Sequence, residues 1–390
     1  MEQVLGMMYG LALGDALGSP VEFWELKGIR ERYGPNGIKE LPAPALFTDD
    51  TQMTLAVAEA LITAGHQDLG AIMAAISQEF VAWLHSPEND RSPGGSCLYG
   101  ARQLEAGVPW WKSGKPNSKG CGAAMRVAPV GYFYQHDLPK LRQVAAATAL
   151  ATHHHPAAQL GAVAAAFLVK LALDGVPPEE MLPALELETH GQVQDFDRTL
   201  ERLEAALEMA SPEAALAHIG EGWVAEEAVM MALYCFCTSP DDFLATIRRG
   251  ANTQGDSDSI ACIAGGISGA YLGIQALPPG WVERIEKSPY LADIARRHQV
   301  AVCCAYDIDH GSGVVQTAVL AVPDGRCFFL PKHPRRVPAP TGSQTMGQGA
   351  LLMTSSADHS QGGRNSPRCH MRSTMVFLCT LHRFRERMSA

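Results

Sequence analysis

Apolar side chains recur at helical spacing along most of the first 300 residues, for example over residues 53–61 and residues 160–171. Good helix formers dominate these stretches, and runs that alternate between apolar and polar residues do not interrupt them. A chain with this pattern buries its apolar surface by packing helix against helix. We therefore expect an all-α fold, with one compact multi-helix domain over residues 1–300.

The first expected helix, over residues 3–18, carries Gly10, Gly14 and Gly18 at intervals of four residues. This spacing places the three glycines on one side of the helix, where the backbone of another helix can approach closely. Asp15 lies inside the run and argues against a membrane-spanning helix. We expect tight packing inside a helical bundle.

Composition narrows the class of protein. With 47% apolar and 18% charged residues among 390, the chain has enough apolar material for a packed globule. The net charge is −10, and residues 331–390 hold nine Lys and Arg against Asp358 and Glu386, which leaves about −17 on the first 330 residues. That charge disfavours a nucleic-acid-binding protein, and no sequence-specific nucleic-acid binding is expected.

The N-terminus has neither a basic segment nor a long apolar segment, so we expect a cytoplasmic protein without a membrane anchor. Ten cysteines include close pairs but no CxxC motif, which favours buried reduced thiols over disulfides or zinc ligands. The sequence gives no indication of the oligomeric state.

Residues 301–390 differ in character from the rest and are expected to be an extension of unknown role. The segment 314–322 has strand composition, Asp324 and Gly325 are typical of a turn, and residues 327–330 could return as a second strand. Beyond this short hairpin we expect a largely disordered basic tail.

Two short acidic segments each precede a helical run. Thr48, Asp49 and Asp50 come before the first run, and Asp256, Asp258 and Ser259 before the second. Either segment alone could be a helix cap, because Thr and Asp cap helices and carboxylates suit a helix N-terminus. Together they offer only oxygen ligands, which suit Mg²⁺ or Mn²⁺, and four carboxylates could hold two such ions.

Five sequence blocks, in order, resemble the ADP-ribosylglycohydrolase family. The blocks are GLALGDALGSPVEF (10–23), FTDDTQMTLAVAEAL (47–61), SKGCGAAMRVAPVG (118–131), ATHHHPAAQLGA (151–162) and GANTQGDSDSIACIAGGISGAYLG (250–273). The resemblance implies an all-α domain with two divalent cations, Mg²⁺ or Mn²⁺, that hydrolyses the glycosidic bond between ADP-ribose and an acceptor.

The resemblance also implies roles for individual residues. The metal ligands would be Thr48, Asp49, Asp50, Asp256, Asp258 and Ser259. Glu22, together with the ligands Asp50 and Asp258, would be catalytic. The substrate would be bound by Gly94, Gly95, Ser118, Gly120, Cys121, Gly122 and His153. The adenine needs an aromatic or apolar slot, for which Trp110, Trp111, Tyr132 and Phe133 are candidates.

The acceptor stays open and could be a protein side chain, a nucleic-acid end or a small molecule. A similar set of carboxylates could instead serve a binuclear-metal nucleotide phosphohydrolase. A third hypothesis is that the chain is a non-catalytic ADP-ribose-binding protein with the same fold.

Overall fold

The computed structural model describes the backbone of residues 1–309, 318–321 and 327–330, and the side chains of residues 1–303. The fold of residues 1–309 is all-α, as predicted. The expected disordered tail lies outside the described residues. The helices, in chain order, are α1 (Glu2–Gly18), α2 (Leu26–Tyr33), α3 (Asp49–Ala64), α4 (Leu69–Leu84), α5 (Gly95–Glu105), α6 (Trp110–Ser113), α7 (Ala128–Phe133), α8 (Leu138–Leu150), α9 (Pro156–Leu173), α10 (Pro178–Thr189), α11 (Gln194–Leu207), α12 (Pro212–Ile219), α13 (Ala225–Cys237), α14 (Phe243–Ala251), α15 (Ser257–Leu272), α16 (Pro279–Arg284) and α17 (Ser288–Asp309).

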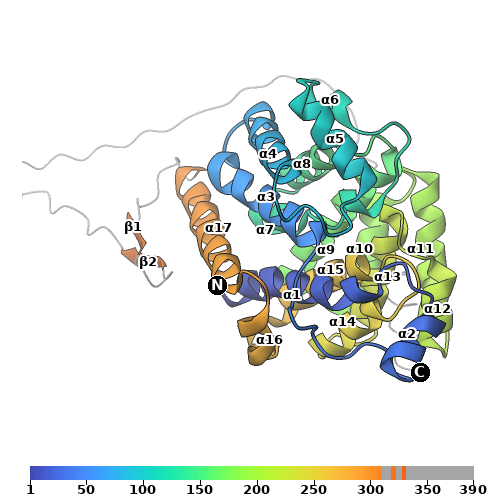
Figure 1. The fold of residues 1–390 in the computed structure, drawn as a ribbon. Coiled ribbons are helices and arrows are strands. Elements are labelled where there is room, and N and C mark those ends of the chain that lie inside the picture. The colour runs from blue at the N-terminus through green and yellow to red at the C-terminus, as the bar shows by residue number, and fades with distance from the viewer. Residues whose placement is uncertain (310–317, 322–326, 331–390) are drawn as a thin grey trace, which may run out of the picture.

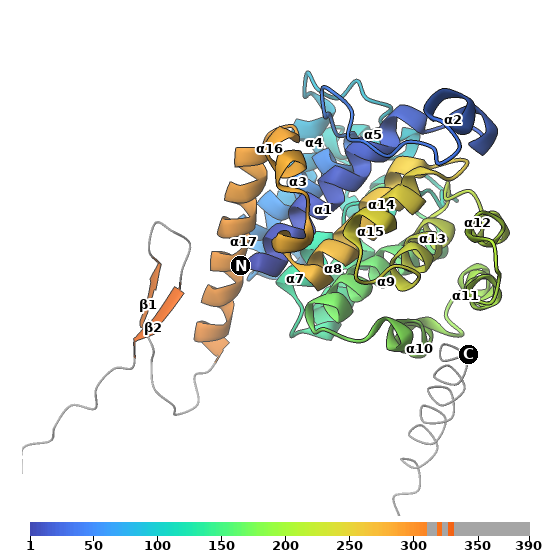
Figure 2. The same ribbon diagram turned by 90° about the horizontal axis from the view of Figure 1, so that it is seen from below.

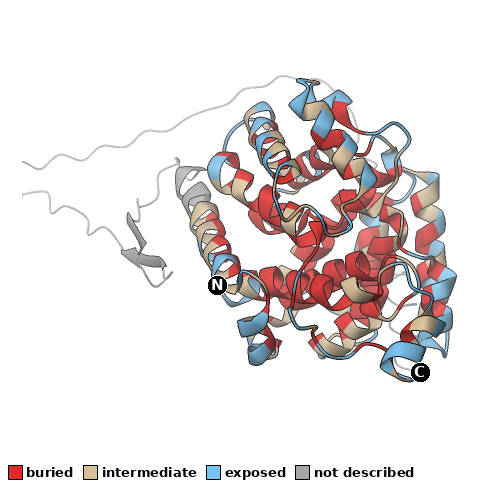
Figure 3. Cartoon of the chain, viewed as in Figure 1, coloured by how far each residue is buried: buried red, intermediate tan, exposed pale blue. Residues whose placement is uncertain are grey.

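Helices α1 and α15 form the centre of the molecule (Figures 1 and 2). Helix α1 is apolar on all sides, and its residues from Gly6 to Gly18 are all buried. The buried residues of Figure 3 gather along this pair and the helices that pack on it. Helix α17 contains residue 300, where we expected the catalytic domain to end, and packs on α1 and α3.

The glycines of α1 face α15 in antiparallel order. A Cβ atom on Gly10 would lie 2.2 Å from the carbonyl oxygen of Gly265, and one on Gly14 would lie 2.0 Å from that of Ala261. A Cβ atom on Gly18 would lie 2.5 Å from the Cα atom of Asp258. The glycine spacing therefore brings the end of α1 beside the start of α15, which carries the second acidic segment.

Gly14→Ala tests this close packing. The backbone of Ala261 cannot yield to a methyl group 2.0 Å away, so the two helices must separate. We expect a loss of about 3 kcal/mol in the free energy of unfolding, measured by urea denaturation. Gly28→Ala in α2 is the matched control, because its methyl group would meet only the Trp24 ring at 3.6 Å. Equal stability of the two variants would contradict the packing argument.

Within the described part of the chain, two helical segments, 2–21 and 156–173, are long and apolar enough to cross a membrane. In the most apolar 18-residue stretch of each, 83% and 78% of the residues, respectively, are buried inside the protein, as is typical of core helices. Among residues 1–303, four cysteines are buried and free, as expected of reduced thiols: Cys97, Cys235, Cys237 and Cys262.

Two short strands follow α17. Strand β1 (Ala318–Ala321) pairs antiparallel with β2 (Cys327–Leu330), and Ala318 lies opposite Leu330. Their side chains lie outside the described part of the chain.

Candidate metal and substrate site

A pocket of about 290 Å³ opens where the end of α1 and the starts of α3 and α15 meet. Twelve of the residues predicted from sequence line it, although they come from segments far apart in the chain. They are Glu22, Asp49, Asp50, Gly94, Gly95, Gly120, Cys121, Gly122, His153, Asp256, Asp258 and Ser259. The fold therefore brings both acidic segments and both glycine-containing loops to one cavity.

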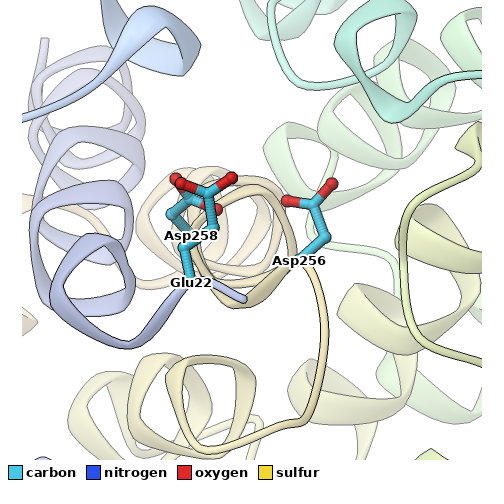
Figure 4. A group of neighbouring side chains, drawn as sticks. All are labelled: Glu22, Asp256 and Asp258. Carbon is cyan, nitrogen blue, oxygen red and sulfur yellow. The ribbon is translucent and has the colours of Figure 1, made fainter. Parts of the chain in front are cut away.

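The second acidic segment meets Glu22 at this pocket. One carboxylate oxygen from each of Glu22, Asp256 and Asp258 lies within 4.8 Å of the others (Figure 4). Asp256 precedes α15, Asp258 lies in its first turn, and Glu22 follows the short helix 19–21 at the end of α1. The Ser257 hydroxyl donates to the carbonyl oxygen of Gly18 at 3.1 Å and joins the two helices at this point.

The first acidic segment begins α3. Thr48 is the N-cap residue, and its hydroxyl oxygen accepts a hydrogen bond from the Asp50 backbone N–H. Asp49 Oδ2 accepts from the Gly94 N–H at 2.9 Å. Asp50 is only 2% exposed, yet its Oδ1 has no hydrogen-bond partner among the described residues. Capping therefore accounts for Thr48 but leaves a buried carboxylate oxygen directed to no protein donor.

Asp15 holds this helix start in place. Its carboxylate accepts hydrogen bonds from the backbone N–H and hydroxyl of Thr48 and from those of Thr51, at 2.6–3.1 Å. Asp15 is fully buried, and burial together with repulsion from Asp258 raises its pKa to about 7. Helix α1 thus holds the first acidic segment through Asp15, and it contacts the start of α15 through Gly18.

Asp15→Asn is expected to weaken divalent-metal binding by about 10-fold to 100-fold, because groups behind the ligands orient them. The amide keeps the volume but replaces one acceptor oxygen with a donor that faces N–H groups. Isothermal titration with Mn²⁺ measures the affinity, and the denaturation midpoint serves as a control for folding. An unchanged affinity would show that Asp15 supports only the fold.

The concentration of buried carboxylates in this pocket favours binding of a cation. Burial, then repulsion from Asp258 and Asp256, raises the pKa of Glu22 to about 10. Burial and repulsion from Asp258 also hold the pKa values of Asp50 and Asp256 well above the usual range. Carboxylates this close cannot all ionise without a compensating positive charge. The all-oxygen ligand set and the partnerless Asp50 oxygen fit hard divalent cations.

The loop that carries Gly120 and Gly122 lies against His153 at the pocket. A Cβ atom on Gly120 would lie 2.9 Å from His153 Nε2, and one on Gly122 would lie 3.2 Å from His153 Cε1. His153 is buried and its Nδ1 lies 2.7 Å from the Thr152 hydroxyl. Burial and the nearby Arg126 hold the pKa of His153 well below its usual value, so the ring is neutral.

Two of the predicted residues, Thr48 and Ser118, are not among the residues that line the pocket. Thr48 is engaged with Asp15, and the Ser118 hydroxyl pairs with that of Ser96 at 2.7 Å. The loop that carries Gly94 is held by Arg91, which donates to the Phe47 carbonyl oxygen and to the Glu286 carboxylate.

None of the four aromatic candidates for the adenine slot lines this pocket. Two other rings do: Phe23, which is 64% exposed, stacks on Trp223 with centroids 5.1 Å apart. Phe23 could have been considered because it adjoins Glu22, but nothing in the sequence pairs it with Trp223, 200 residues away.

Comparisons with known proteins agree with this geometry. The sequence model of the ADP-ribosylglycohydrolase family matches residues 1–307. An uncharacterised protein of Archaeoglobus fulgidus is 32% identical over 76% of this chain and 95% of its own length. The ADP-ribosylarginine hydrolase Tri1 of Pseudomonas putida is 26% identical over 76% of this chain and 77% of its own length. A solved structure described as an ADP-ribosylglycohydrolase-related protein complex aligns with a TM-score of 0.60 and 25% identity, over 77% of this chain and 98% of its own.

Proposed function

The chain belongs to the ADP-ribosylglycohydrolase family, and on this basis we propose that it is a metal-dependent hydrolase that releases ADP-ribose from a modified protein side chain. The proposed cofactor is a pair of divalent cations, Mg²⁺ or Mn²⁺. The proposed metal ligands are those predicted from sequence, in the starts of α3 and α15.

One observation carries the proposal: two acidic helix starts, separated by some 200 residues of sequence, converge with Glu22 on a single pocket. A capping role for each segment would not explain why the two helix starts lie at the same pocket. At this point the Asp50 oxygen has no partner among the described residues. Burial, with added repulsion from Asp258, raises the pKa values of Asp49, Asp50 and Asp256. Burial also raises the pKa of Asp258 itself. A charge-compensated metal site explains both features.

The pocket residues suit glycoside hydrolysis. Divalent cations bound here would supply the positive charge that orients the ribose and polarises a water molecule. The carboxylates around them would stabilise the positive charge that develops on the ribose ring in an oxocarbenium-like transition state. Glu22 has its carboxylate among these groups and can accept a proton from the attacking water or give one to the departing acceptor.

Glu22→Gln separates proton transfer from metal binding. We expect kcat to fall by about 10²-fold to 10⁴-fold, the usual contribution of a general acid or base, while Mn²⁺ affinity changes less than about tenfold. Steady-state kinetics and Mn²⁺ titration give the two values. A collapse of Mn²⁺ affinity would instead make Glu22 an essential ligand.

The acceptor is proposed to be a protein side chain, since a relative is named for ADP-ribosylarginine. Release of ADP-ribose should be measured from arginine-, serine- and nucleic-acid-linked substrates. Free ADP-ribose from one of the protein linkages supports the proposal and names the acceptor. Release of AMP would instead indicate a nucleotide phosphohydrolase. Binding of ADP-ribose without turnover of any substrate would indicate a non-catalytic binding protein.

A further inference from the structure

Phe23 is an exposed aromatic side chain that lines the pocket. It is 64% exposed, and its ring stacks on that of Trp223 with centroids 5.1 Å apart and an angle of 19° between the ring planes. Because Trp223 covers one face of the Phe23 ring, the exposed area includes the opposite face. An aromatic face that is open at a pocket can stack on a planar group of a ligand.

The backbone conformation of Phe23 places its ring beside Glu22. In an extended segment, consecutive side chains point to opposite sides, yet Glu22 and Phe23 both line the pocket. Phe23 has a φ of +69°, a left-handed conformation that is rare for a bulky residue. Its N–H donates to the Gly255 carbonyl oxygen at 3.2 Å, which holds this conformation. The chain thus keeps a strained residue that brings an open ring next to the proposed acid or base.

The position of Glu22 assigns this ring to the acceptor end of the substrate. The Glu22 carboxylate adjoins those of Asp256 and Asp258, two of the proposed metal ligands. Glu22 is proposed to exchange a proton with the attacking water or with the departing acceptor, so the acceptor must pass close to it. The adenine lies at the other end of ADP-ribose, beyond the diphosphate and a second ribose. A ring on the residue next to Glu22 therefore meets the acceptor.

The charge of the pocket favours a cationic acceptor. Among the described residues that line it there is no Lys or Arg, and the His153 ring is neutral because burial holds its pKa well below the usual value. Two divalent cations would balance the charges of the four aspartates in the lining and would leave Glu22 as an additional acid. A cationic acceptor would therefore meet no side chain of like charge in the pocket lining.

We propose that Phe23 stacks on the guanidinium group of an ADP-ribosylated arginine and thereby selects arginine as the acceptor. The inference rests on the proposed function and names its substrate class. A guanidinium group is planar and cationic, and it stacks on aromatic faces with a cation–π attraction. The oxygen of a modified serine and the phosphate of a nucleic-acid end are neither planar nor cationic, so they gain nothing from the ring.

Phe23→Leu in the full-length, Mn²⁺-loaded protein tests this role. We expect kcat/KM for an ADP-ribosylarginine peptide to fall by about 3-fold to 30-fold, the range of a cation–π contact. The inhibition constant of free ADP-ribose should be unchanged, because this product lacks the acceptor. Phe23→Tyr keeps the aromatic face and should keep kcat/KM.

Trp24→Leu is the matched control. Trp24 is also a partly exposed aromatic residue of this segment, but it is not among the residues that line the pocket. This variant should keep both kcat/KM for the arginine peptide and the inhibition constant of ADP-ribose.

Equal values of kcat/KM in Phe23→Leu and in the wild type would overturn the proposal. Weaker inhibition of Phe23→Leu by ADP-ribose would also overturn it, because the ring would then contact the nucleotide. If the wild type cleaves a serine-linked substrate but not the arginine peptide, the proposed function stands and the role of Phe23 is refuted. No release of ADP-ribose from any protein substrate would count against the proposed function itself and, with it, against this proposal.

Discussion

Asp258→Asn is expected to abolish ADP-ribose release and divalent-metal binding while it stabilises the metal-free protein. Asp258 repels each of the other acidic groups of the site, since it raises the pKa values of Asp15, Glu22, Asp49 and Asp50. Removing one negative charge relieves that repulsion when no cation is bound. The same change removes the carboxylate that faces both Glu22 and Asp256.

We expect activity to fall by at least 100-fold, because changes to groups that only support metal ligands already cost about 10-fold to 100-fold. In EDTA, the midpoint of thermal unfolding should rise relative to the wild type. Ser268→Ala, a change in the buried part of α15 away from the pocket, controls for disturbance of the helix. A variant that loses activity and also melts earlier than wild type in EDTA would indicate a structural role for Asp258.

The second large effect is a pH-dependent stabilisation by metal. The folded-state pKa values of Asp15 and Asp49 are raised to about 7 and that of Glu22 to about 10, above their values in the unfolded chain. The folded metal-free protein therefore binds more protons than the unfolded chain, and this contribution to stability is lost as the pH rises from about 4 through 7 and beyond. A divalent cation reverses the loss because it stabilises the ionised carboxylates.

The gain in unfolding free energy caused by Mn²⁺ should consequently increase between pH 5 and pH 8. At a free concentration 1,000 times Kd, one bound ion adds about 4 kcal/mol. Urea denaturation with Mn²⁺ and with EDTA at each pH gives the difference. A gain that is absent, or that shrinks as the pH rises, would contradict the electrostatic account.

The features of the fold that could be predicted from the sequence are those encoded by nearby residues. The spacing of Gly10, Gly14 and Gly18 predicted a close helix contact, and these glycines pack against α15. The two acidic segments were identified because carboxylates and hydroxyls stand directly before helical runs. That both meet in one pocket could be expected only from the family resemblance, because nothing local encodes a contact across 200 residues.

Other features were missed because their roles exist only through tertiary contacts. In the sequence, Asp15 is a single polar residue in an apolar helix. Its role becomes visible only in the folded protein, where it accepts hydrogen bonds from Thr48 and Thr51. Phe23 and Trp223 form a stack whose two halves have no sequence relation. The aromatic candidates Tyr132 and Phe133 pack in the core instead, where aromatic side chains bury most apolar area.

The most direct test of the central claim is release of ADP-ribose as metal is restored to the metal-free protein. We predict no release in EDTA and a return of activity that saturates at two equivalents of Mn²⁺ per chain. Full activity in EDTA, with metal analysis confirming that the protein is free of divalent ions, would contradict the account.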